Sequence, residues 1–139
     1  MTAMPLSPPV PTQARDLLAS SARSLLEAHA APDPARRYAA AHLSALRAAA
    51  AVLATRAMPG RRGRIRSVWV LLPAVAPQLQ EWAVFFAANA SKRAAADAGL
   101  VHVVSQRDAD DLVRDAEIFL AHVAALIGVD QQAVLPGGI

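Results

Sequence analysis

The sequence predicts an all-α protein, a four- to five-helix up-down bundle, and three observations support this fold class. Apolar residues recur at three- and four-residue steps through most of the chain, which places them on one face of successive helices. Proline and glycine stand between the periodic segments, where helices begin and end. The connections are short, and short connections join antiparallel helices. With 139 residues, the chain is long enough to bury one core.

The chain divides into one helical domain, residues 12–128, between two tails. Residues 1–11 carry four prolines and no helical period, which indicates a disordered or extended tail. Residues 129–139 are predicted to form a flexible C-terminal tail. The sequence shows no signal-peptide pattern and no apolar run of about 18 residues, so we expect a cytoplasmic protein without membrane contact. The absence of cysteine excludes disulfides and thiolate chemistry.

The first two helices are predicted to form an antiparallel hairpin. Thr12 is the expected N-cap of the first, which ends near Ala31. The second occupies Asp33–Arg56, with Asp33 as N-cap and Pro34 at the first helical position, and ends near Met58. Its predicted apolar face consists of Tyr38, His42, Ala45, Leu46, Ala49 and Leu53. Its predicted polar side consists of Arg37, Ser44, Arg47 and Thr55.

The middle of the chain predicts a short helical turn and then a longer helix. Ser67 is the expected cap of a turn at Val68–Leu72. The helical period resumes at Pro77 and runs to about Asp97, with Gly99 as the C′ residue. The predicted inward residues are Leu79, Trp82, Ala83, Phe85, Phe86 and Ala90. A stacking platform for bases is the alternative for these aromatic residues, but their helical spacing favours the core.

The last helix has the clearest boundaries. Ser105 and Asp108 form a capping-box-like start, and Gly128 ends the helix. The predicted inward residues are Leu112, Ala116, Phe119, Leu120, Val123, Leu126 and Ile127. An acidic cluster occupies its first half: Asp108, Asp110, Asp111, Asp115 and Glu117. We interpret the cluster as a solvated helix start, favoured by the helix dipole, over the alternative of a divalent-ion site.

Neither a metal nor a cofactor is expected. The four histidines are His29, His42, His102 and His122. They are too dispersed for two of them to share one helix face at metal-ligand spacing. The sequence also contains no phosphate-binding loop and no nucleophile-elbow motif.

The segment Met58–Arg66 is the strongest candidate for contact with a partner. It contains Arg61, Arg62, Arg64 and Arg66 among two glycines and a proline. Arginine binds phosphate through its planar fork, so this basic loop predicts salt-sensitive binding to nucleic acid. The alternative is a solvated loop in a protein whose thirteen arginines reflect a GC-rich genome.

Three strings in the sequence point to a known family: RYAAAHL at residues 37–43, SVW at 67–69 and EWA-FFA at 81–87. With the order of the helices, they resemble the HEPN superfamily, and within it the actinobacterial SAV_6107-like HEPN domain. The resemblance covers Ala14 to Gly128. It implies a four- to five-helix up-down bundle that is commonly dimeric. The superfamily includes metal-independent RNases, toxins and non-catalytic modules that bind nucleic acid or nucleotides.

The resemblance also implies where catalytic residues would lie. Active members carry an arginine, a polar residue and then a histidine after four to six intervening residues, late in the domain. Here Arg114–Asp115 reproduces the start, and His122 follows after seven residues. The two side chains are about 80° apart on a helix, so both can face one cleft. Pairs with the family's spacing are Arg37/His42, Arg36/His42 and Arg23/His29. The apolar face around His42 favours a core histidine.

Three functions therefore stay open. The leading hypothesis is a non-catalytic HEPN-type module that binds RNA or other nucleic acid, or a protein partner, as a homodimer. The second is a metal-independent endoribonuclease that uses Arg114 and His122. The third is a purely structural interaction domain whose alanine-rich helix faces form an oligomer.

Overall fold

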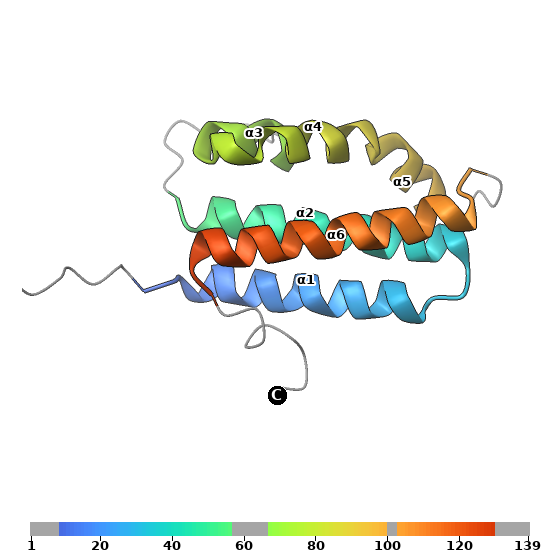
Figure 1. Cartoon of the computed structure of the whole chain (residues 1–139), viewed down its shortest axis with the longest axis horizontal. Helices are drawn as coiled ribbons and strands as arrows, with labels where there is room; N and C mark the ends of the chain where they lie inside the picture. The colour runs from blue at the N-terminus through green and yellow to red at the C-terminus, as the bar shows by residue number, and fades with distance from the viewer. Residues whose placement is uncertain (1–8, 57–66, 100–102, 130–139) are drawn as a thin grey trace, which may run out of the picture.

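The computed structural model describes residues 9–56, 67–99 and 103–129 (Figure 1). Within these ranges the chain is all helical, and the predicted fold class is confirmed. The elements are α1 (Thr12–Ala30), α2 (Pro34–Ala54), α3 (Val68–Val75), the 3₁₀ turn η1 (Pro77–Leu79), α4 (Gln80–Ala88), α5 (Ala90–Asp97) and α6 (Gln106–Ile127). In the described part, no helix is long and apolar enough to cross a membrane.

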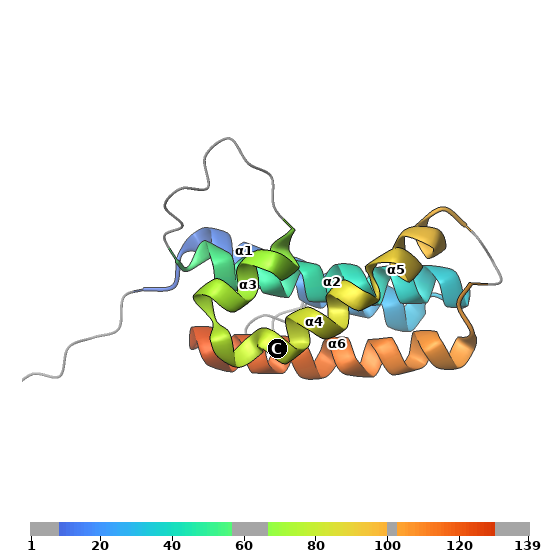
Figure 2. The ribbon, with the colours of Figure 1, turned by 90° about the horizontal axis from the view of Figure 1, so that it is seen from above.

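Three long helices and one broken layer make up the bundle. Helices α1, α2 and α6 lie side by side, with α1 antiparallel to both α2 and α6, and α3, α4 and α5 form a further layer along them (Figure 1). Helices α3 and α4 fold back on each other, and α4 and α5 then run towards the end of the bundle where α6 begins (Figure 2). Helix α2 is central, because it packs against α1, α3, α5 and α6.

Because α2 is packed on several sides, its buried residues are not confined to one apolar face. Ser44, which the sequence places on the polar side, is completely buried against α1. There the Ser21 hydroxyl donates to the Ser44 carbonyl at 2.7 Å, and the two hydroxyl oxygens lie 3.0 Å apart. Small side chains allow the neighbouring helices to approach α2 closely. The fully buried alanines of α2 are Ala41, Ala45, Ala48, Ala49 and Ala51.

The starts of α1 and α2 differ in detail from the prediction. Thr12 is the first helical residue of α1, and Pro11 occupies the N-cap position without a side-chain hydrogen bond. Asp33 is the N-cap of α2 and Pro34 follows it, as predicted, but the Asp33 carboxylate makes no capping hydrogen bond. The connection is short, and the predicted antiparallel hairpin is confirmed.

Helix α2 ends earlier than the sequence suggests. Its last residue is Ala54, and the Thr55 hydroxyl donates to the Val52 carbonyl at 2.7 Å. This bond occupies one of the carbonyls that are free at a helix end. Met58, the predicted end, lies outside the described residues.

The predicted helix from Pro77 to Asp97 is interrupted at Asn89. The Asn89 backbone N–H donates to the Phe86 carbonyl, and its side-chain amide donates to the Phe85 carbonyl, at 3.1 and 3.0 Å. His42 of α2 also bonds the Phe86 carbonyl, through Nε2 at 3.0 Å. Competition for these carbonyls explains the break between α4 and α5. The predicted ends of this region are confirmed, since Ser67 caps α3 and Gly99 has a positive φ.

Helix α6 follows the prediction most closely. The Ser105 hydroxyl accepts from the Asp108 N–H at 2.9 Å, and the Asp108 carboxylate accepts from the Ser105 N–H at 3.1 Å. Gly128 ends the helix with a φ of 90°. Val129, which the sequence assigns to the tail, is buried with the core.

An aromatic cluster fills the space between the broken layer and α6. The rings of Trp69 and Phe119 each lie close to that of Phe86, with both centroids 5.1 Å away, and all three side chains are buried. Trp82 is half-buried and stacks on Phe86 at 5.9 Å. Phe85 is 37% exposed, so its assignment to the core is wrong. Ala83 and Phe86 are buried and define the inward face of α4. Phe85 is rotated from Phe86 by about 100° around the helix, so it points away from that face.

Candidate functional site

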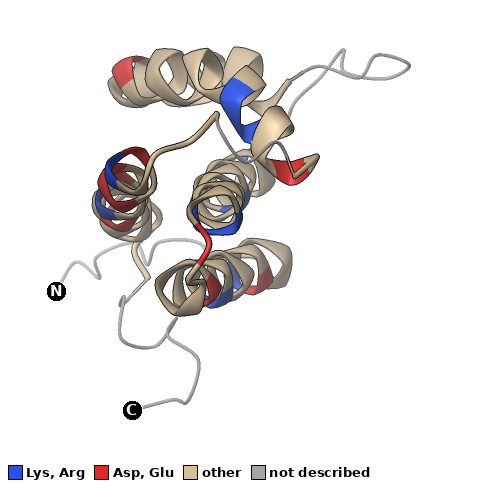
Figure 3. Ribbon diagram, turned by 90° about the vertical axis from the view of Figure 1, so that its right-hand side faces the viewer, with Lys and Arg blue, Asp and Glu red and all other residues tan. Residues whose placement is uncertain are grey.

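A polar groove lies where the end of α1 and the start of α2 meet α6. His29 comes from α1 and Arg37 from the first turn of α2. Asp110, Arg114 and Glu117 come from α6, and Val113 completes the lining. Positive and negative residues both occur along the first half of α6 (Figure 3).

Arg37 has a structural role in this groove. Its Nε donates to the carbonyls of Ala28 and Ala31, both at 3.1 Å, and its guanidinium donates to Asp110 at 2.6 Å. The first two bonds satisfy carbonyls that α1 leaves free at its C-terminus. The third ties the hairpin to α6. Only 22% of the side chain is exposed, so Arg37 is held in place by all three bonds.

The remaining charges of the groove form two exposed pairs. His29 Nε2 lies 2.7 Å from Glu117 Oε1, and Arg114 donates to Asp111 at 2.8 Å. Exposed pairs of this kind contribute about 0–1 kcal/mol to stability. A histidine oriented by a carboxylate, with an arginine nearby, is nevertheless a set of groups suited to acid–base chemistry on a phosphodiester.

The structure places Arg114 and His122 beside different neighbours of α6, about 80° apart around the helix. Arg114 lines the polar groove beside α1. His122 is exposed beside α4, where its ring lies 5.9 Å from that of Trp82. Arg114 therefore shares a groove with His29, a residue that sequence reasoning paired only with Arg23. The two residues are far apart in the chain, so no spacing motif could have revealed that groove.

His42 is a core histidine, as its sequence position predicts. It is 2% exposed, and its ring meets those of Trp69 and Phe86 edge-on. Its Nε2 donates to the Phe86 carbonyl, which leaves Nδ1 buried without a hydrogen-bond partner. Burial lowers the pKa of His42, and Arg93 acts in the same direction, against the Phe86 carbonyl and Asp97. The imidazole is therefore neutral and unavailable to a substrate.

This burial predicts that the protein loses stability in mild acid. The pKa of His42 is lower in the folded state than the unfolded value of about 6.5. The unfolded chain therefore binds more protons below that pH, and the free energy of unfolding falls by up to about 1.4 kcal/mol per pH unit. Urea denaturation at pH 7.5 and 5.0 measures the difference, and His42→Leu should reduce it. An unchanged pH dependence in that variant would contradict the prediction.

The pairs Arg36/His42 and Arg23/His29 do not meet the needs of a catalytic site either. Arg36 and Arg23 are exposed, whereas His42 is enclosed by aromatic rings. His29 turns to Glu117 on another helix. His29 and His42 are the two histidines that follow an arginine at the family's spacing. Both are therefore bonded to other groups.

Arg61, Arg62, Arg64 and Arg66 lie outside the described residues. The net charge of the rest of the chain is still informative. Four of the 14 Lys and Arg residues and one of the 11 Asp and Glu residues lie outside the described ranges, which leaves ten of each inside them. The whole excess of positive charge therefore belongs to the arginine segment.

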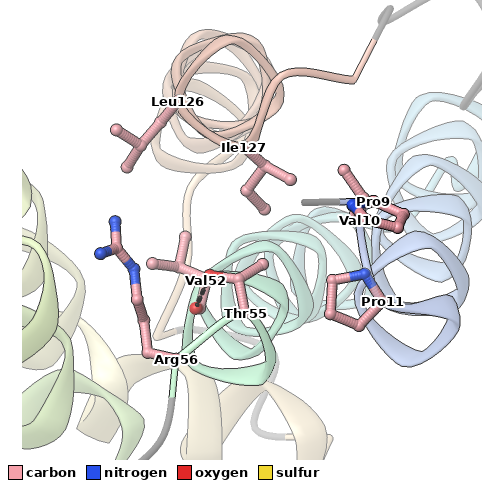
Figure 4. Close-up of a pocket in the computed structure, with 8 residues that line it drawn as sticks. All are labelled: Pro9, Val10, Pro11, Val52, Thr55, Arg56, Leu126 and Ile127. Carbon is pink, nitrogen blue, oxygen red and sulfur yellow. Dashed lines mark hydrogen bonds between the residues drawn. The ribbon is translucent and has the colours of Figure 1, made fainter. Parts of the chain in front are cut away.

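The end of the bundle where α2 and α6 end carries a mostly apolar pocket. Its lining comes from three places: the residues before α1, the end of α2 and the end of α6 (Figure 4). The lining residues are Pro9, Val10, Pro11, Val52, Thr55, Arg56, Leu126 and Ile127. Arg56 is the one ionisable group among them. Among the described residues, the lining of the pocket thus contains no acid–base pair, and no group of three His, Asp or Glu side chains is placed to hold a metal ion.

A family model described as SAV_6107-like HEPN matches residues 28–124, which is well over half of the chain. The matched residues run from the end of α1 through most of α6 and include the whole polar groove. No curated protein and no solved structure matches the chain.

Proposed function

Because the chain belongs to the SAV_6107-like HEPN family, we propose that it is a non-catalytic HEPN module that binds RNA or another nucleic acid as a homodimer. The observation that carries the proposal is the distribution of charge. The described helices hold equal numbers of basic and acidic residues, so the net positive charge of the chain belongs to the segment with Arg61, Arg62, Arg64 and Arg66. A concentrated positive charge binds phosphates without regard to sequence.

The state of the histidines supports the non-catalytic part. His42 is buried and bonded to a backbone carbonyl, and His29 is paired with Glu117. Arg37 is held by two carbonyls and Asp110. Within one chain, Arg114 lies in the polar groove beside α1, whereas His122 lies beside Trp82 of α4. None of these arrangements gathers an arginine and a histidine with the family's spacing around a common substrate position.

The test is the binding of labelled single-stranded RNA, followed by fluorescence anisotropy at several salt concentrations. Arg61→Ala combined with Arg62→Ala should weaken binding and reduce the slope of log K against log salt by about 1.4, since each phosphate contact on a single strand contributes about 0.7. The matched control is Arg15→Ala combined with Arg107→Ala, which removes the same charge from exposed helix positions. This control should keep most of the affinity. Equal losses in both double variants would contradict a role for the arginine segment.

A metal-independent endoribonuclease is the second candidate, and the polar groove is the observation that favours it. The groove brings the His29–Glu117 pair and Arg114 together from two helices. Incubation with RNA in excess chelator tests this function. We expect the RNA to stay intact. Cleavage that His29→Ala abolishes would assign catalysis to the groove, whereas cleavage that His122→Ala abolishes would assign it to Arg114 and His122.

A further inference from the structure

The outer face of α6 carries an exposed isoleucine between a charged half and a small-residue half. Ile118 is 42% exposed, although the inner face of α6 buries its apolar residues completely or nearly so. Asp111 and Arg114 precede it, and Ala121 and Ala125 follow it, at alternating steps of three and four residues. This is the spacing of a seam along which two helices pack. Among the described helices, α6 packs mainly against α1 and α2, and Ile118 is exposed on the side away from them.

Two titratable residues, Asp115 and His122, flank Ile118 on the side of α6 that faces α4 and α5. Asp108 marks this side, because it lies 3.4 Å from Lys92 of α5, and His122 marks it through its contact with Trp82. Asp115 stands seven residues from each, which is about two helical turns, so it shares their side. Partial burial raises the pKa of Asp115, and Asp111 adds to this, while Arg114 opposes it.

Asp115 differs from its acidic neighbours in lacking an ion-pair partner. Within the described ranges, Asp108 pairs with Lys92, Asp110 with Arg37, Asp111 with Arg114 and Glu117 with His29. Neither Asp115 nor His122 has a salt bridge or side-chain hydrogen bond to any described residue. A carboxylate and an imidazole therefore stand unpaired on one side of the seam, three residues before Ile118 and four residues after it.

We propose that a second copy of this chain packs on this face, with α6 antiparallel to α6 around a two-fold axis beside Ile118. A two-fold axis at that position brings Asp115 level with the partner's His122, and the same pair forms again across the axis. The inference rests on the proposed homodimer and assigns its interface. We name the face made by Asp111, Arg114, Ile118, Ala121 and Ala125, with Asp115 and His122 at its edge, the α6 seam.

Size and charge both favour the antiparallel arrangement. The charged half of one seam, Asp111 and Arg114, lies against the partner's small half, where alanine leaves room for the long arginine stem. A parallel pair would instead place Arg114 opposite the partner's Arg114 and Asp111 opposite the partner's Asp111. Like charges placed directly opposite each other destabilise such a pair.

The neighbouring helix extends the seam. Trp82 is half-buried beside His122, and Phe85, one turn further along α4, is 37% exposed. Its ring meets that of Trp82 edge-on, with the centroids 6.4 Å apart. Stable interfaces bury about 1,200–2,000 Å² in total, which is more than a single pair of helices provides. The aromatic edge of α4 supplies further apolar surface on the same side.

Sedimentation equilibrium over a range of protein concentrations tests the proposal. The wild-type chain should be a dimer, and Ile118→Asp should raise the dissociation constant at least about tenfold, because it places two carboxylates at the axis. The matched control is Val84→Asp, since Val84 is 64% exposed on α4 and lies about 200° around that helix from Trp82. This control should leave the dimer intact. Circular dichroism spectra should show the same helix content in all three proteins.

A charge exchange makes the test specific for the predicted pair. Asp115→Arg and His122→Asp should each weaken the dimer, because the first removes the carboxylate that faces the partner's His122 and the second places two carboxylates opposite each other. The double variant should restore the dimer. An equimolar mixture of the two single variants should form a heterodimer, whereas each variant alone should dimerise weakly. A dimer that Ile118→Asp leaves intact would overturn the seam but not the homodimer. A wild-type chain that is monomeric throughout would overturn both, and RNA anisotropy would still test nucleic-acid binding separately.

Discussion

Replacing Phe86 with alanine should lower the free energy of unfolding by about 3–5 kcal/mol, the loss typical of a large aromatic residue removed from a core. Phe86 is completely buried, and its ring contacts the rings of Trp69, Trp82 and Phe119. These residues come from α3, α4 and α6, so the variant leaves a cavity where the broken layer meets α6. Urea denaturation followed by circular dichroism measures the change.

Phe85→Ala is the control for this prediction. Phe85 neighbours Phe86 in the chain but is 37% exposed, so its removal takes less apolar surface from the core and should cost clearly less. If the two variants were equally destabilised, Phe86 would not be the centre of the aromatic cluster, and the packing of α4 described above would be wrong.

Replacing Ser44 with leucine should destabilise the fold by about 1–3 kcal/mol or more, because the larger side chain overpacks the contact between α1 and α2. Ser44 is completely buried, and its hydroxyl lies 3.0 Å from that of Ser21. Thermal and urea denaturation both measure the effect.

Ser44→Ala separates crowding from the loss of a hydrogen bond. The Ser21 hydroxyl keeps its bond to the Ser44 carbonyl in this variant, so the cost should be no more than about 1 kcal/mol. A loss in Ser44→Ala as large as that in Ser44→Leu would show that the hydroxyl pair, rather than close packing, holds α1 against α2.

Local signals in the sequence predict α6 well because the residues that start and end it act within their own turn. Ser105 and Asp108 bond each other's backbone, and Gly128 adopts the positive φ that ends the helix. The same holds for Gly99 after α5. Where a boundary depends on neighbouring residues alone, the amino-acid pattern contains all the information needed.

The prediction fails where another helix decides the outcome. Ser44 is buried because α2 is packed on several sides, which a single amphipathic face cannot represent. The break at Asn89 involves His42, which reaches the Phe86 carbonyl from a helix more than forty residues earlier. The polar groove is of the same kind, since His29 and Glu117 are 88 residues apart.

The candidate site was predictable only in part for the same physical reason. The family, the buried state of His42 and the excess charge of the arginine segment follow from strings and composition. The separation of Arg114 from His122 follows from where α1 and α4 lie against α6, which depends on tertiary packing. A helical step of about 80° is compatible with one cleft or with two flanks, and only the neighbouring helices distinguish them.

The measurement that tests the central claim most directly is a titration of labelled single-stranded RNA with wild-type protein in excess chelator, at low and moderate salt. Anisotropy reports binding, and a denaturing gel of the same samples reports whether the RNA is intact. The proposed function predicts binding that weakens as salt increases, with full-length RNA recovered at every protein concentration. RNA that is cleaved in chelator, or that does not bind even at low salt, would contradict it.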